Sequence, residues 1–126
     1  MAFSWAAARC NALANLLADS FVDGVGKWFT SVPAEICDFD FTGDGFSSAS
    51  AGVVTNTTMT VGTNATGSSK TIASLRVYED DGTTEIGRSA ASTIGGGQAV
   101  ELTSLTLGDG DTIQLTEFEI SVGPVT

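Results

Sequence analysis

The chain has 126 residues, a formal net charge of −10 and no histidine. The missing histidine excludes Ser-His-Asp and Cys-His catalysis within the chain and removes the most common metal ligand. The acidic balance argues against nucleic acid and anionic membranes as partners, because phosphate groups attract clusters of lysine and arginine. The length suits a modest core. We therefore expect one domain over residues 1–126, with residues 1–24 as a helical segment that packs on, or extends from, a strand-rich part at 26–123.

The N-terminal segment at residues 4–21 has the periodicity of an amphipathic helix, and Ser4 is its predicted N-cap. Such a helix either covers the open face of a sheet or packs on a neighbouring subunit, and in the second case Trp5 and Leu16 are candidate contacts. The segment lacks the basic start of a secretion signal and is too short and polar to span a membrane, so we expect synthesis in the cytoplasm. Its apolar stripe comprises Ala6, Cys10, Leu13, Leu17 and Phe21, widened by Leu16.

Two short strands are predicted next, at residues 27–30 and 35–41. Trp28 and Phe29 point to opposite faces, so one belongs to the core and the other is a candidate contact for a partner. In the second strand one face carries Cys37, Phe39 and Phe41, and the other carries Ile36, Asp38 and Asp40. Cys10 and Cys37 both stand in apolar contexts and are predicted to be buried free thiols.

The middle of the chain combines a threonine-rich strand with a predicted hairpin. The strand at residues 53–61 places Val53, Thr55, Thr57, Met59 and Val61 on one side, and residues 62–69 form the loop predicted to be most flexible.

Residues 70–84 predict a strand that runs into a tight turn at Asp80-Asp81-Gly82. Alternation buries Ala73, Leu75 and Val77 and turns Arg76 and Tyr78 outward, where they are candidate contacts.

The C-terminal third predicts a short return strand at 85–88, a glycine-rich loop at 90–97 and two further strands. The apolar residues of these two strands change face at Thr103-Ser104 and at Thr116-Glu117. Such a change requires a bulge or bend. We expect the two strands to form an antiparallel hairpin through residues 108–111 with matched bends. The predicted fold is mainly β, a single antiparallel β-sandwich or partly closed barrel with one N-terminal α-helix.

The acidic residues Asp38, Asp40 and Asp44 were the only cluster that suggested a metal site. They do not match a calcium loop, because Thr42 stands where a third ligand belongs and no bidentate glutamate closes the loop. A glycosidase pair of carboxylates would need a cleft with aromatic platforms, and most aromatic residues here are needed for the core. We therefore expect no catalytic residues, no metal and no cofactor. Asn56-Thr57-Thr58 and Asn64-Ala65-Thr66 match the glycosylation pattern but carry no functional weight without a secretion signal.

Four segments stand out in the second half of the chain: SLRVYEDDGTT at 74–84, the glycines at 95–97, VELTSLTL at 100–107 and GDTIQLTEFEI at 110–120. With further segments in the first half, in order along nearly the whole chain, they resemble a family of small virion structural proteins of tailed bacteriophages. NALAN at 11–15, KWFTSVPA at 27–34 and FSSASAGVV at 46–54 agree more loosely. The two cysteines and DFDFTGDG at 38–45 depart from the family pattern, and no functional residue is carried onto them.

The resemblance implies a non-enzymatic virion component. Within that class we expect a capsid decoration (cement) protein on the outer surface of the phage head. Its expected partners are the major capsid protein and further copies of itself, with a trimer favoured. Two alternatives remain open: a tail subunit such as a tube, terminator or fibre-base protein, and a carbohydrate- or receptor-binding β-domain. The candidate contact residues are Trp5, Leu16, Trp28, Phe29, Arg76 and Tyr78.

Overall fold

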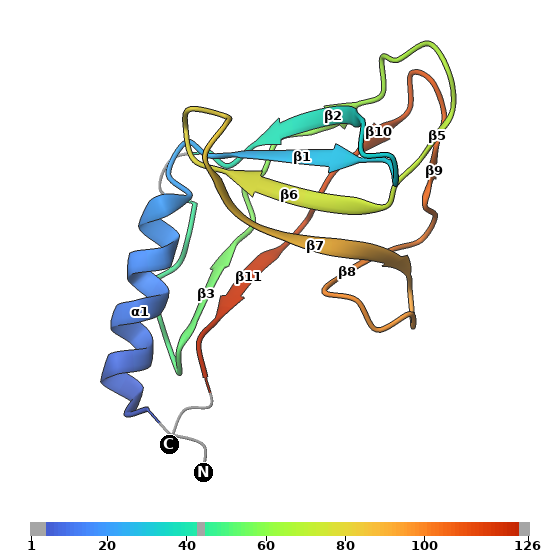
Figure 1. The fold of residues 1–126 in the computed structure, drawn as a ribbon. Coiled ribbons are helices and arrows are strands. Elements are labelled where there is room, and N and C mark those ends of the chain that lie inside the picture. The colour runs from blue at the N-terminus through green and yellow to red at the C-terminus, as the bar shows by residue number, and fades with distance from the viewer. Residues whose placement is uncertain (1–4, 43–44, 124–126) are drawn as a thin grey trace.

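The computed structural model describes residues 5–42 and 45–123, so Ser4 and Asp44 lie outside the described residues. It confirms a mainly β chain with one N-terminal helix, in which a five-stranded sheet curls into an open half-barrel (Figure 1). In chain order the elements are α1 (Ala7–Ser20), β1 (Val25–Phe29), β2 (Glu35–Asp40), β3 (Val53–Asn56), β4 (Gly62–Thr63), β5 (Lys70–Thr71), β6 (Ser74–Tyr78), β7 (Glu85–Thr93), β8 (Val100–Leu102), β9 (Thr106–Leu107), β10 (Thr112–Ile113) and β11 (Phe118–Ser121).

The five-stranded sheet has the order β2-β1-β6-β7-β8. Its first four strands pair antiparallel, whereas β8 runs parallel to the end of β7, where Ala91–Thr93 pair with Val100–Leu102. β7 is longer than the predicted strand at 85–88, because residues 90–93 continue it instead of forming a loop. The return to β8 is made by the glycine-rich segment 94–99, in which Gly95 and Gly97 have φ values of 92° and 83°.

The other six strands form three two-stranded sheets, which follow one another along the same two arms of the chain and are together called the ribbon. β3 pairs with β11, β4 with β10 and β5 with β9, all antiparallel. The predicted hairpin through residues 108–111 is therefore wrong, because the strands on either side of that turn pair with earlier strands. The predicted changes of face do mark strand ends: Thr103-Ser104 separates β8 from β9, and Thr116-Glu117 separates β10 from β11.

Two Asn-x-Thr segments lie where the first arm of this ribbon is interrupted. Asn56 and Asn64 are fully buried. In each segment the asparagine Oδ1 accepts hydrogen bonds from the backbone N–H and the hydroxyl of the threonine two residues later. The distances are 2.8 and 2.9 Å for Thr58, and 3.0 and 2.7 Å for Thr66. Residues 62–69, predicted to be a flexible loop, are thus held by a buried side chain, and both matches to the glycosylation pattern have a structural role.

The core lies on the concave face of the half-barrel and is built around aromatic rings. Trp28 is completely buried, and its ring centre lies 6.0 Å from that of Phe39, which lies 5.3 Å from that of Phe41. Trp28 is therefore the core member of the Trp28/Phe29 pair and is not accessible to a partner. A register shift between Trp28 and Phe29 buries Ile36 beside Phe39, so the predicted alternation fails at that end of β2.

Helix α1 packs on β3 and β11 through small residues (Figure 1). Its N-cap is Ala6, which makes no side-chain cap bond, and its buried residues are Cys10, Ala14 and Ala18. The predicted stripe holds at Cys10 and Phe21 but is wrong at Ala6 and at its leucines, because Leu13 and Leu17 are each 41% exposed and Leu16 is 64% exposed.

The strand under the helix also differs from the prediction. The predicted strand at 53–61 places Val53, Thr55 and Met59 on one side, but β3 ends at Asn56 and buries Val54 and Asn56, while Met59 is buried beyond its end. Val54 packs against the helix, so the position of α1 decides which face of β3 is inside.

The β6–β7 hairpin agrees with the sequence pattern at its centre and tip. Leu75 and Val77 are buried, Ala73 is half-buried, and Gly82 at the turn has a φ of 69°. The Asp81 carboxylate accepts hydrogen bonds from the backbone N–H of Thr83 at 2.9 Å and of Thr84 at 2.8 Å, and from the Thr84 hydroxyl. These bonds favour the charged carboxylate.

The turn carboxylate gives a pH prediction. The hydrogen bond from the Thr84 hydroxyl, followed by the backbone bonds, lowers the Asp81 pKa from 3.8 to about 2. Because the folded-state pKa is depressed, the contribution of this turn is complete above pH 4 and is lost as the pH falls towards 2. We expect a carboxyl titration by NMR to place Asp81 near 2. Thr84→Val should raise this value and Thr83→Val should change it little; equal responses would contradict the assignment.

Candidate functional site: an open groove in the half-barrel

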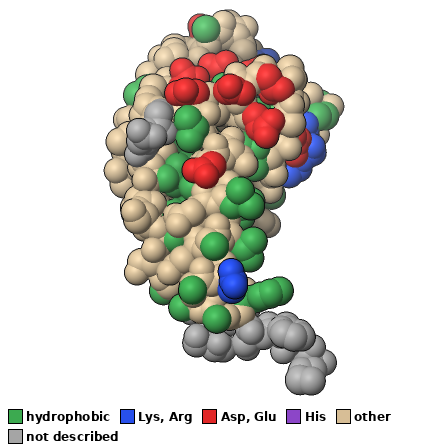
Figure 2. Space-filling model, turned by 90° about the vertical axis from the view of Figure 1, so that its left-hand side faces the viewer, with side chains coloured by type: hydrophobic (Ala, Val, Ile, Leu, Met, Phe, Trp, Pro, Cys, Tyr) green, Lys and Arg blue, Asp and Glu red, His purple; other side chains and the backbone are tan. Residues whose placement is uncertain are grey.

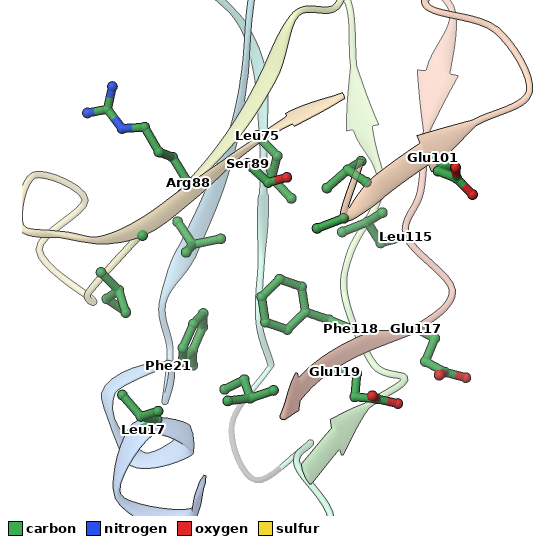
Figure 3. A pocket seen from close by; sticks show the side chains of 16 residues that line it. Leu17, Phe21, Leu75, Arg88, Ser89, Glu101, Leu115, Glu117, Phe118 and Glu119 are labelled. Carbon is green, nitrogen blue, oxygen red and sulfur yellow. The ribbon is translucent and has the colours of Figure 1, made fainter. Parts of the chain in front are cut away.

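The half-barrel is open on one side, and a groove of about 620 Å³ lies there between the five-stranded sheet and the β11–α1 side of the molecule (Figure 3). Residues from the end of α1, from β6, β7 and β8, and from residues 115–120 border it. The lining residues are Leu17, Phe21, Leu75, Val77, Ile86, Gly87, Arg88, Ser89, Ala99, Val100, Glu101, Leu115, Glu117, Phe118, Glu119 and Ile120.

The groove has an apolar floor. Leu75 and Val77 form part of the buried core, and Phe118 packs against the core with its ring centre 5.3 Å from that of Phe21. Ile86, Val100, Leu115, Phe118 and Ile120 are half-buried, so each reaches the core and still borders the open space. The groove therefore continues the core surface to the outside without a covering layer from the described part of the chain.

The rim of the groove is acidic. Glu101, Glu117 and Glu119 are exposed and border it from β8 and the start of β11. Arg88 also borders it, but Figure 3 shows its side chain pointing away from the groove, so its main chain faces the open space. The arginine is bound to Glu85 through bonds of 2.6 and 2.7 Å. The groove thus presents apolar side chains, with three carboxylates along its β8 and β11 side (Figure 3).

Exposed leucines extend this apolar surface onto the helix. Leu17 borders the groove and is 41% exposed, and Leu16, beside it on α1, is 64% exposed. Figure 2, viewed from the side on which α1 lies, shows hydrophobic side chains on the lower part of this face and acidic ones gathered above them. Two predicted contact residues, Trp5 just before α1 and Leu16 on it, are exposed, Trp5 by 49%.

The other accessible predicted contacts lie on the convex face of the sheet, away from the helix. Arg76 lies over the ring of Phe29 at 4.4 Å, and Lys27 lies over the ring of Tyr78 at 5.0 Å. Strand register places Lys27 opposite Arg76, and Arg76 opposite Arg88. Phe29, Arg76 and Tyr78 therefore form one half-buried group, separate from Trp5 and Leu16.

Neither cysteine is arranged for chemistry. Both are free; Cys10 is buried and Cys37 is half-buried. Burial, with smaller effects from Asp38 and Glu35, raises the pKa of the Cys37 thiol to about 11, which keeps it in the weakly nucleophilic protonated form. Within residues 5–42 and 45–123 no three His, Cys, Asp or Glu side chains are placed to hold a metal ion, and Asp38 and Asp40 are exposed on β2.

Most groove residues were not singled out from the sequence. The available signal for the groove was the alternation of Glu117, Phe118, Glu119 and Ile120, which is typical of a strand with one solvent-exposed face. That pattern does not show whether the apolar face is covered, because the cover is decided by the distant strands β7 and β8.

Among the described residues no helix has the length and apolar character needed to cross a membrane. Comparisons of the chain with models of protein families, with curated proteins and with solved structures find no match.

Proposed function

We propose that this protein is a non-enzymatic structural subunit that decorates the outer surface of a tailed-phage capsid and stabilises the shell. The observation that carries the proposal is the apolar surface formed by the groove and the helix leucines, Leu16 and Leu17, which no described segment of the chain covers. Uncovered apolar surface of this kind marks protein–protein contact sites. The resemblance of residues 74–84 and 100–120 to small phage virion proteins supplies the viral context.

The charge distribution supports a protein partner at an exterior surface. A net charge of −10 keeps the free protein soluble, and its long-range field favours a partner with basic patches. We propose the major capsid protein as that partner and further copies of the chain, arranged as a trimer, as neighbours on the shell. The protein is then made in the host cytoplasm and resides on the capsid exterior.

Sedimentation with purified, undecorated phage heads tests this function. We expect the protein to bind in hundreds of copies per head and Leu16→Asp to weaken binding at least tenfold, because it places a charge in the apolar contact. Val32→Asp is the matched control, since Val32 is 80% exposed in the β1–β2 connection and lies outside the proposed contact. Binding only to tails, in a handful of copies, or selective binding on a glycan array would contradict the proposal.

A further inference from the structure

We propose that the free edge of β7 accepts an extended segment of the partner, which adds a strand to the half-barrel and carries lysine or arginine between apolar residues. The inference rests on the proposed function only in taking that partner to be the shell protein. It specifies the backbone atoms that bind and the chemistry of the segment.

The first part of β7 has a sheet neighbour on one side only. β6 pairs with β7 from Glu85 to Ala90, whereas β8 pairs with it only at Ala91–Thr93. Within the described part of the chain, no strand therefore covers the β8 side of residues 86–90. An uncovered strand edge presents a row of N–H and C=O groups that a further strand can pair with.

Strand register identifies the free groups. In an antiparallel pair every second residue directs its N–H and C=O to the same neighbour. The N–H of Ala91 donates to the C=O of Ala73 at 2.9 Å, so Ser89 and Gly87 also face β6. Arg88 and Ala90 have the opposite parity, and their N–H groups face the open side.

The free edge borders the apolar groove along its length. Ile86, Gly87, Arg88 and Ser89 all line the groove, which is where a strand paired with β7 would lie. Alternate side chains of an added strand point to opposite faces. One set would therefore enter the groove, where Phe118 and Leu115 offer apolar contacts, and the other set would point to solvent. Backbone pairing and apolar burial thus act together on the same ligand.

Charge defines the rest of the ligand. The groove rim carries Glu101, Glu117 and Glu119, and Arg88, the one cation among the described residues that line the groove, is already bound to Glu85. A segment with lysine or arginine beside its apolar residues complements this rim, whereas an acidic segment is repelled. A second copy of this chain is a poor occupant for the same reason, since its own net charge is −10.

Amide hydrogen exchange measured by NMR tests strand addition without any mutation. The probe is a short capped peptide of alternating lysine and valine. We expect the amides of Arg88 and Ala90 to exchange quickly in the free protein and at least tenfold more slowly with peptide. Those of Gly87 and Ser89 are the internal control, because they are bonded to β6 and are protected in both states.

Two further peptides test the charge of the ligand and its backbone pairing. A peptide of alternating glutamate and valine should bind at least tenfold more weakly, and the variant Glu117→Lys/Glu119→Lys should reverse this preference. A lysine–valine peptide that is N-methylated at every residue, whose backbone cannot pair on either edge, should not protect Arg88 and Ala90. Equal binding of the acidic peptide, or binding without protection of these two amides, overturns the inference.

The result separates this inference from the proposed function. Binding to heads by a protein whose Arg88 and Ala90 amides stay unprotected on the head overturns strand addition and leaves the decoration role intact. Protection by the peptide with no binding to heads overturns the decoration role alone. Protection that appears without peptide and grows with protein concentration identifies a second copy as the occupant and overturns the proposed ligand.

Discussion

Replacing Trp28 with alanine is expected to destabilise the protein by about 3–5 kcal/mol, because the change removes a large, completely buried ring and leaves a cavity that the β-sheet cannot close. Trp28 stands opposite Cys37 on β2 and Leu75 on β6, and its ring contacts Phe39. It therefore joins β1 to both of its neighbouring strands. The free energy of unfolding, measured by urea denaturation with far-UV circular dichroism, gives the value without relying on tryptophan fluorescence.

Two variants make the Trp28 prediction specific. Trp28→Phe should lower the free energy of unfolding much less than Trp28→Ala. Phenylalanine keeps most of the apolar contact, and the substitution removes an indole N–H that has no hydrogen-bond partner among the described residues. Phe29→Ala should cost about 1 kcal/mol, because this ring is half-buried on the convex face and loses mainly its contact with Arg76. If Phe29→Ala costs as much as Trp28→Ala, the assignment of Trp28 to the core side is wrong.

Replacing Asn64 with alanine is expected to cost about 2–4 kcal/mol, because it removes four hydrogen bonds from one buried side chain. Its Oδ1 accepts from the N–H and hydroxyl of Thr66, and its Nδ2 donates to the C=O of Ser68 at 3.0 Å and of Leu107 at 2.8 Å. The last bond joins the two arms of the ribbon. Its loss removes this side-chain partner from the C=O of Leu107, a buried residue.

Asn56→Ala is the matched comparison for Asn64→Ala. Asn56 is equally buried and makes the same two bonds to the threonine two residues later, but its Nδ2 has no hydrogen-bond partner in the described structure. Alanine there removes two bonds and one unsatisfied donor together, so we expect a cost of about 1 kcal/mol. Equal losses of unfolding free energy in the two variants would show that the Nδ2 bonds of Asn64 add nothing.

The sequence predicted strand-like segments better than it predicted their partners. Alternation at Leu75 and Val77 and the turn at Gly82 are local, and the structure confirms both. The change of face at Thr116-Glu117 was also found, but it ends one strand and begins another that has a different partner. A change of parity is compatible with a bend, a bulge or a change of partner, and nothing local separates the three.

The helix shows a second limit of periodicity. Leu13, Leu16 and Leu17 have more apolar surface than Ala14 and Ala18, so a transfer scale places the leucines inside. The structure buries the alanines instead. Close packing against Val54 leaves room only for small side chains, and that distance is set by the tertiary fold.

The predicted contact residues show the same difference between local patterns and tertiary structure. The outward direction of Phe29, Arg76 and Tyr78 agrees with strand parity, whereas the exposure of Leu16 does not follow from the predicted helix stripe. The sequence did not predict the groove, because the groove exists only where β8 leaves the first part of β7 unpaired. The groove exists because no described strand covers the first part of β7, and this leaves no pattern in the residues that line the groove.

The ribbon also bears on how the chain reaches this fold. Its pairings are nested: β5–β9 lies inside β4–β10, which lies inside β3–β11, and the local β6–β7 hairpin is at the centre. Direct pairing of β3 with β11 would close a very long loop, at a high entropic cost. Pairing outward from the Asp81 turn closes only a short loop at each step. The Asp81 turn is not part of the proposed binding surface. It is instead the point from which strand pairing can proceed outward to β3 and β11.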